Sequence, residues 1–206
     1  MKQSIKFVET LRIENGIIEA EERHLSRLNQ TVYEFYNQNI NFESREVFIP
    51  EKFRNGIVKC RILYSSKIEK IDFFPYRCKT IHSLKAVNGK QTDYSWKYAD
   101  RYALENLLKQ KENHDEIIII RNRHVTDTSF SNIIFFDGKN YYTPDTFLLN
   151  GIRRQQLLKA GIIKEMEILV EDIPSFKSVF LINTMLLPKD AVTIDTVDID
   201  ISTFRK

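Results

Sequence analysis

The sequence predicts an α/β protein of the α+β type, with a small N-terminal lobe and a larger C-terminal lobe. Alternating apolar residues open the chain and then give way to an apolar period of three and four, which indicates a strand followed by a helix. A second series of strand and helix patterns contains four consecutive isoleucines, typical of a strand buried on both faces. We therefore expect a small α+β lobe over residues 1–80, a polar connector over 81–95 and a larger α/β lobe over 96–206.

Composition favours a globular protein with an apolar core. Of the 206 residues, 42% are apolar and 29% are charged, close to the average for folded domains, which excludes dominant disorder. The net charge is only +3 and the basic residues are dispersed, so we expect no nucleic-acid partner. Cys60 and Cys78 supply neither a disulfide framework nor, by themselves, a four-ligand zinc site.

Targeting and metal-binding signals are missing from the sequence. No apolar run approaches the roughly 20 residues that cross a bilayer, and charges interrupt the first ten residues, unlike a signal peptide. We therefore expect a cytoplasmic protein without membrane contacts. The four histidines have no metal-ligand spacing, and the chain contains no glycine-rich nucleotide loop, so we expect no metal site.

The N-terminal lobe should be built from a hairpin, a helix and two further strands. Asn15-Gly16 follows the first strand and is a strong hairpin signal. Glu9 interrupts the apolar face of that strand, where a carboxylate costs free energy unless it is paired or lines a wet cleft. The expected elements are a strand over 5–13, helices over 21–37 and, more weakly, 43–53, and strands over 57–64 and 67–76.

The C-terminal lobe should alternate helices with strands. Asp137-Gly138 indicates a second hairpin, and Gly161 is a helix C-cap candidate. The expected elements are helices over 98–110 and 152–160 and strands over 116–121, 132–136, 140–143, 165–170 and 178–183. A cleft between two such lobes is a common place for a ligand.

Four stretches carry polar residues in a distinctive order. They are Glu9–Arg12 followed by His24-Leu25 with Arg27, then Trp96–Arg101, Val125–Ile133, and Tyr142–Pro144 leading to Leu149–Gln155. In this order and spacing, the chain resembles the class IV pyridoxal-phosphate aminotransferase family. That family includes branched-chain and D-amino-acid aminotransferases and 4-amino-4-deoxychorismate lyases. The resemblance covers nearly the whole chain and implies a two-lobed fold type IV enzyme, with a barrel-like sheet in the larger lobe and pyridoxal 5'-phosphate as cofactor.

The resemblance assigns two residues to the reactive part of the cofactor. Lys97 takes the position of the family's Schiff-base lysine; otherwise it is a surface lysine. Asp127 takes the position of the glutamate that keeps the ring nitrogen protonated, since a nearby anion raises the pKa of that nitrogen. Aspartate is one methylene shorter, and its alternative role is that of a turn residue.

Other matched positions concern the cofactor's phosphate. Arg27 corresponds to the arginine that grips the phosphate, its alternative being a solvated place on the helix. A helix start, whose backbone amides bind anions, and a strand end complete the implied phosphate contacts. These positions are Gly151, Ile152, Arg153, Asn183 and Thr184. Arg153 replaces the family's usual threonine, and a simple strand end is an alternative reading of Asn183-Thr184.

Within the family, the run Lys97–Arg101 resembles the lyases more than the aminotransferases. We therefore favour a lyase that releases pyruvate and 4-aminobenzoate for folate synthesis. Tyr102, five residues after Lys97, keeps a branched-chain or D-amino-acid aminotransferase open. The departures at Asp127 and Arg153 leave a non-catalytic cofactor-binding protein as a further alternative.

The implied partners are a small anionic or amino-acid substrate and a second copy of the chain. Arg12 and Arg61 are candidates to hold substrate carboxylates, although a solvent-facing place on a strand is the alternative for each. Family members build their site near a subunit interface, and two small lobes would expose much apolar surface alone. The expectation is therefore a homodimer.

Overall fold

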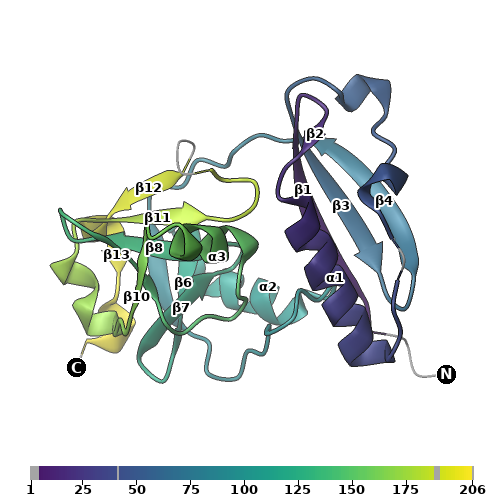
Figure 1. Ribbon diagram of the computed structural model, residues 1–206. Coiled ribbons are helices and arrows are strands. Elements are labelled where there is room, and N and C mark those ends of the chain that lie inside the picture. The colour runs from purple at the N-terminus through teal and green to yellow at the C-terminus, as the bar shows by residue number, and fades with distance from the viewer. Residues whose placement is uncertain (1–4, 41, 188–190, 206) are drawn as a thin grey trace. The chain divides into compact units, whose positions relative to one another are not determined.

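The computed structural model describes residues 5–40, 42–187 and 191–205 and divides the chain into two compact units (Figure 1). The first unit contains the chain up to Cys78 together with Trp96–Asp100, and the second contains Lys79–Ser95 and the chain from Arg101 onward. The mixed α+β architecture expected from the sequence is confirmed. The boundaries differ from those expected, because 79–95 belongs to the second unit and 96–100 to the first.

The first unit is built on an antiparallel sheet with strand order β2-β1-β3-β4. Asn15 and Gly16 join β1 to β2 and have φ angles of 50° and 80°, as a two-residue hairpin turn requires. The expected hairpin is therefore confirmed. The strands are β1 (Phe7–Glu14), β2 (Ile17–Ile18), β3 (Ile57–Tyr64) and β4 (Ile68–Pro75).

Helix α1 (Glu21–Tyr36) lies along one face of this sheet (Figure 1). Its buried Leu28 and Val32 belong to one apolar cluster with side chains of β1 and β3, which confirms the period-based expectation of a helix here. The Trp96–Asp100 segment joins this unit because Val8 donates its N–H to the Lys97 carbonyl at 3.0 Å. The Trp96 and Phe35 rings also meet edge to face, 5.2 Å apart.

The weaker helix expected over 43–53 is wrong. The structure has only short 3₁₀ turns there, at Ser44–Glu46 and Glu51–Phe53. Pro50 separates them with an extended backbone, φ −61° and ψ 145°. Proline lacks the N–H that a continuous helix needs and disfavours helical geometry in the residue before it.

The second unit holds two sheets, with strand orders β13-β5-β6-β7 and β10-β9-β8-β11-β12. Because β7 and β8 follow one another but lie in different sheets, the turn Ser129–Ser131 passes from one sheet to the other. The first sheet contains β5 (Leu84–Asn88), β6 (Glu116–Arg121), β7 (His124–Thr128) and β13 (Ile199–Asp200). The second contains β8 (Asn132–Phe136), β9 (Tyr141–Pro144), β10 (Lys164–Met166), β11 (Ser178–Ile182) and β12 (Val192–Asp195).

Two helices, α2 (Tyr102–Leu108) and α3 (Ile152–Lys159), complete the second unit. The helix expected over 98–110 begins later than expected, because the chain before it pairs with β1. Helix α3 has Ala160 as its C-cap, and Gly161, the expected C-cap, is the next residue. Its φ of +67° is the left-handed conformation that commonly ends a helix. The strand expected over 165–170 ends early, and a 3₁₀ segment follows at Val170–Ser175.

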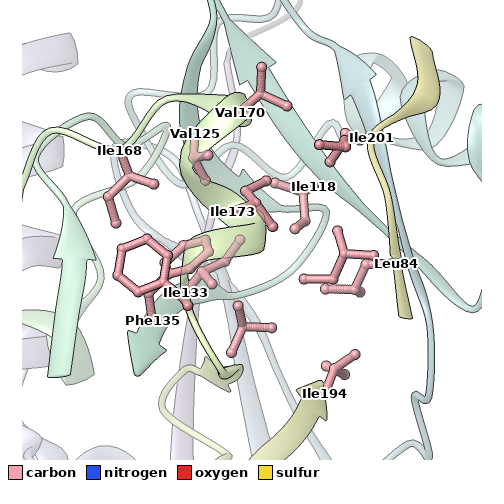
Figure 2. Close-up of a cluster of buried hydrophobic side chains, with 14 of the residues drawn as sticks. Leu84, Ile118, Val125, Ile133, Phe135, Ile168, Val170, Ile173, Ile194 and Ile201 are labelled. Atoms are coloured by element: carbon pink, nitrogen blue, oxygen red, sulfur yellow. The ribbon is translucent and has the colours of Figure 1, made fainter. Parts of the chain in front are cut away.

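The core of the second unit is made of branched aliphatic and aromatic side chains from both sheets. Figure 2 shows Ile118, Ile133, Phe135 and Ile173 gathered in one cluster. All four isoleucines of β6 are buried, as the sequence predicted. This packing fixes β7, which carries Asp127, and β8, which begins at Asn132.

Candidate active site

A buried ion pair lies at the centre of the first unit, between β1 and α1. Glu9 is 1% exposed, and both of its oxygens accept from Arg27: Nε donates to Oε1 and Nη2 to Oε2, each at 2.7 Å. The ring nitrogen Nδ1 of His24 lies 2.8 Å from Glu9 Oε2. The fork of the guanidinium matches the carboxylate, which compensates the cost of burying both charges.

The protonation of this cluster follows from its contacts. Burial would raise the pKa of Glu9, but the Arg27 charge and the hydrogen bonds from His24 and Arg27 hold it at about 2. Burial lowers the pKa of His24, against the opposing effect of Glu9. An ionised carboxylate only accepts, so His24 donates from Nδ1, and its buried Nε2 has no hydrogen-bond partner among the described residues.

Lys97 belongs to the same unit as Arg27, not to the larger unit as expected. Its side chain is half-buried, and its charge, like that of Arg27, contributes to the lowered pKa of His24. The first unit thus holds two of the predicted cofactor residues close to a buried histidine and a buried carboxylate.

Arg12 and Arg61 lie apart from this cluster. Successive residues of a strand point to opposite faces, and Arg61 of β3 pairs with Thr10 of β1, so both arginines lie on the sheet face opposite Glu9. Arg12 is 1% exposed and forms ion pairs with Glu14 and Glu19, each at 3.1 Å. Its solvent-facing alternative is therefore wrong, and its role in substrate binding stays a prediction, as does that of half-buried Arg61.

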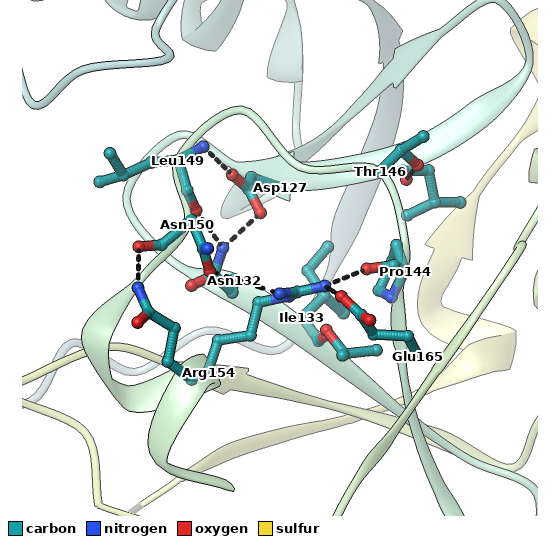
Figure 3. A network of polar contacts seen from close by, with 12 residues as sticks. Asp127, Asn132, Ile133, Pro144, Thr146, Leu149, Asn150, Arg154 and Glu165 are labelled. Carbon is teal, nitrogen blue, oxygen red and sulfur yellow. Dashed lines mark hydrogen bonds and ion pairs between the residues drawn. The ribbon is translucent and has the colours of Figure 1, made fainter. Parts of the chain in front are cut away.

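The second unit surrounds the Asp127 carboxylate with hydrogen-bond donors (Figure 3). The Asp127 carboxylate is buried at the C-terminal part of β7 and accepts three hydrogen bonds. Asn132 Nδ2 donates to Oδ1 at 2.7 Å, and the N–H groups of Leu148 and Leu149 donate to Oδ2 at 2.9 Å each. Asp127 therefore joins β7, the start of β8 and the loop before α3.

The charge of Asp127 suits a cationic partner. Burial raises its pKa to about 6, although the three hydrogen bonds and the charge of Arg154 oppose that rise. A carboxylate has about four lone-pair positions, and Asn132 and the two backbone groups account for three of them. One lone-pair position of the carboxylate accordingly remains for a protonated ring nitrogen, and in this respect the donor set fits the cofactor.

Two other predicted positions of the second unit, Gly151 and Asn183, lie next to residues at the β7–β8 connection. Gly151 is the N-cap of α3, and a Cβ built on it would lie 2.1 Å from Asn132 Oδ1. Asn183, after β11, donates from Nδ2 to the Phe130 carbonyl at 3.3 Å and accepts from the Met185 N–H at 2.8 Å. Four further positions are placed as follows: Ile152 is buried, Arg153 and Thr184 are half-buried, and Tyr102 is exposed.

Arg154 and Arg101 also make contacts in the second unit, although the sequence motifs gave neither residue a role. Arg154 is 2% exposed and donates to the Pro144 carbonyl at 2.9 Å and to Glu165 Oε1 at 2.6 Å, which ties α3 to β9 and β10 (Figure 3). Arg101 donates to the Ser129 carbonyl at 2.8 Å, in the turn after Asp127. The sequence signal for Arg154 was its position as a basic residue in the first turn of the expected helix.

Neither a membrane-spanning helix nor a metal site is found in the described ranges. The helices there are too short or too polar to span a membrane. Within the same ranges, no group of three or more histidine, cysteine, aspartate or glutamate side chains is arranged to hold a metal ion.

Comparison with known proteins identifies the family. The family model for amino-transferase class IV matches residues 80–188, which is more than half of the chain. An uncharacterized protein of Haemophilus influenzae is 39% identical over 181 residues, covering 86% of this chain and 96% of its own length. The chain belongs to the amino-transferase class IV family, whose members are pyridoxal-phosphate enzymes.

Solved structures show the same fold. The structure of a candidate 4-amino-4-deoxychorismate lyase from Haemophilus somnus has a TM-score of 0.81 and 36% identity, covering 90% of this chain and 98% of that chain. A hypothetical aminotransferase from Mycobacterium tuberculosis, in its pyridoxal-phosphate-bound form, has a TM-score of 0.74 and 15% identity, covering 92% and 80%. At 15% identity, the similarity to this second structure concerns the fold alone.

Replacing Glu9 by glutamine should destabilise the protein and change its pH dependence. The folded-state pKa of Glu9 lies below its ordinary value of 4.5, at about 2. Its ionised form therefore stabilises the fold above pH 4.5, and this stabilisation is lost as the pH falls from 4.5 to 2. Breaking a buried pair costs about 3–5 kcal/mol at neutral pH. Urea unfolding from pH 3 to 7 measures both effects, and an equal stability difference at every pH would contradict the account.

Proposed function

We propose that the protein is a pyridoxal-phosphate-dependent 4-amino-4-deoxychorismate lyase, which releases pyruvate and 4-aminobenzoate for folate synthesis in the cytoplasm. The observation that carries the proposal is the 36% identity with the candidate lyase from Haemophilus somnus, which the chain matches over 98% of that protein's length. The run Lys97–Arg101 supports the same choice, because it resembles the lyases more than the aminotransferases.

The proposal gives cofactor roles to residues of each unit, taken by itself. In the first unit, Arg27 binds the phosphate and Lys97 carries the cofactor, while Glu9 orients the Arg27 guanidinium through two hydrogen bonds. In the second unit, Asp127 holds the ring nitrogen. Backbone N–H groups at the start of α3, from Gly151 to Arg153, and the Asn183-Thr184 segment supply further phosphate contacts.

The reaction converts the substrate ring into an aromatic one. When bound, pyridoxal phosphate withdraws electrons from the carbon that bears the substrate's amino group. That carbon loses its proton to Lys97 Nζ, and the neighbouring carbon–oxygen bond breaks with its electron pair passing to the enolpyruvyl oxygen. Enolpyruvate then takes up a proton and becomes pyruvate, and the ring remains as 4-aminobenzoate. Asp127 keeps the ring nitrogen of the cofactor protonated while Lys97 removes the proton from the substrate.

Assay of the purified, cofactor-loaded protein with 4-amino-4-deoxychorismate tests the proposal. We expect equal amounts of 4-aminobenzoate, followed by its fluorescence, and pyruvate, followed with lactate dehydrogenase. Branched-chain and D-amino acids, each with 2-oxoglutarate, form the comparison. Keto-acid formation from these donors, without 4-aminobenzoate from the first substrate, would overturn the lyase assignment.

A class IV aminotransferase is the second candidate. Tyr102, the first residue of α2, stands at the position after Lys97 where the resembled aminotransferases carry a tyrosine. Its side chain is 69% exposed in the single chain and is therefore accessible to a ligand. Tyr102→Phe should leave the lyase reaction within about twofold of the parent, the effect of a surface change, and a large loss of transamination would favour this candidate.

Arg27→Ala should weaken cofactor binding. The substitution removes a charge-assisted contact to the phosphate and takes the cationic partner from the buried Glu9 carboxylate, which keeps its hydrogen bond from His24. We expect the dissociation constant for pyridoxal phosphate to rise by about 10- to 100-fold, which corresponds to the 1.5–3 kcal/mol of a hydrogen bond to a charged group. Titration followed by absorbance measures it, with Arg45→Ala, an exposed arginine of the same unit, as the control. Unchanged cofactor retention would make Arg27 a structural residue.

The protein should be a homodimer in solution. Large apolar side chains are exposed on the single chain, among them Ile17 at 71%, Phe48 at 77% and Tyr33 at 58%, and association of two copies would remove apolar surface from water. Sedimentation equilibrium at micromolar concentration should give twice the mass of the chain. A monomer at that concentration would contradict this expectation.

A further inference from the structure

The side chain of Asn132 stands between two parts of the second unit that are proposed to contact the cofactor. It begins β8 and is buried, with 7% of its surface exposed. Its Nδ2 donates to Asp127 Oδ1 at 2.7 Å and to the Leu149 carbonyl at 2.9 Å (Figure 3). One carboxamide nitrogen therefore joins the carboxylate of β7 to the loop that leads into α3.

The orientation of this carboxamide follows from its partners. An ionised carboxylate and a backbone carbonyl accept hydrogen bonds but cannot donate them, so the nitrogen must face Asp127 and Leu149. The oxygen Oδ1 then faces Gly151, where a Cβ would lie only 2.1 Å away. Gly151 has φ −67° and ψ 142°, a conformation open to any residue. Its backbone conformation therefore does not require glycine, whereas the neighbouring Asn132 does.

We propose that Asn132 is a positioning residue that fixes the Asp127 carboxylate relative to the Leu148–Gly151 segment. In this proposal, position 151 is glycine because the Asn132 carboxamide occupies the space that a side chain would fill. The inference rests on the proposed function for what Asp127 does at the cofactor. The coupling of positions 132 and 151 is a property of the chain itself and is measurable without cofactor.

A cycle of variants tests the coupling in the cofactor-free protein. Gly151→Ala should lower the Tm by several degrees, because the added Cβ overlaps Asn132 Oδ1. In an Asn132→Ala background, the same change should cost little, because the carboxamide is gone. If Gly151→Ala costs the same in both backgrounds, the proposed coupling is wrong.

Gly161→Ala is the matched control, at the other end of α3. Gly161 has φ +67° and nothing within 4 Å of a Cβ, so alanine there is strained only by its own backbone. It should cost the same Tm with asparagine or alanine at position 132. Where Asn132→Ala gives no folded protein, Asn132→Ser takes its place, because serine also withdraws the carboxamide oxygen from Gly151.

The second measurement separates positioning from mere packing. Carbon-13 NMR of the cofactor-free protein follows the titration of the Asp127 carboxyl group. Loss of the Asn132 hydrogen bond should raise the pKa of Asp127 above its parent value in Asn132→Ala and Asn132→Ser, and an unchanged titration would overturn the positioning role. Both measurements remain valid if the protein is not a lyase. If the protein is a lyase but lacks this coupling, the inference is wrong and the proposed function is unaffected.

Discussion

Replacing Lys97 by alanine should abolish turnover while the protein remains folded. Lys97 carries the cofactor and moves the substrate proton in the proposed mechanism, and no other group of the first unit takes both roles. We expect a loss on the order of 10³-fold or more, the range seen when an essential nucleophile is removed. The variant should also lack the absorption band of the covalent link between cofactor and lysine, while the phosphate contacts still hold the cofactor.

The matched control is Lys70→Ala. Lys70 is an exposed lysine of β4 whose ion pair with Asp72 lies at the surface, where such pairs contribute about 0–1 kcal/mol. Its loss should change neither turnover nor the absorption band. Circular dichroism and Tm verify that both variants fold. Residual turnover of Lys97→Ala within tenfold of the parent would remove Lys97 from the mechanism.

Replacing Asp127 by asparagine should have the second largest effect, a fall of about 10²–10³-fold in kcat, as expected when one preorganised charge is removed from a buried site. Asparagine cannot keep the ring nitrogen protonated, so the cofactor withdraws electrons less strongly. Cofactor affinity should change little, because phosphate contacts contribute most of it. Asp127→Glu restores the residue of the resembled family and should retain substantial activity.

The cofactor-free Asp127→Asn protein offers an independent measurement. Because burial raises the pKa of Asp127 from 3.8 to about 6, the folded state holds a proton there that the unfolded state releases. Ionisation of Asp127 therefore reduces stability as the pH rises from 3.8 to 6, by about 3 kcal/mol at about 1.36 kcal/mol per pKa unit. The variant should lack this part of the pH dependence. If Asp127→Asn is as active as the parent and its pH dependence is unchanged, Asp127 is only a turn residue.

The elements that are determined by residues close together in the sequence could be predicted from it. The Asn15-Gly16 hairpin, helix α1 and the buried isoleucines of β6 each follow from a local pattern of turn residues or apolar spacing. Strand β5 lies in the stretch expected to be a polar connector, so that expectation is wrong there. Its short run contains a lysine, and it becomes a strand by pairing in parallel with β6. The pairing of Trp96–Asp100 with β1 joins residues still farther apart in sequence, with Tyr98 opposite Phe7.

The candidate site shows the same division. Lys97, Arg27 and Asp127 stand in recognisable motifs, so the sequence could single them out. The partners of these residues could not be inferred, because Glu9 meets Arg27 across 18 positions and Asp127 meets Leu149 across 22. The polar interruption at Glu9 was the one sequence signal that a buried charge needed a partner.

Borohydride reduction of the loaded protein, followed by peptide mapping, tests the central claim most directly. Reduction makes the link between cofactor and lysine permanent, so mass spectrometry can locate the modified residue. The account predicts a single modified peptide, the one that contains Lys97, and none in Lys97→Ala. A modified peptide that contains any other lysine, or no modified peptide in the loaded parent, would contradict it.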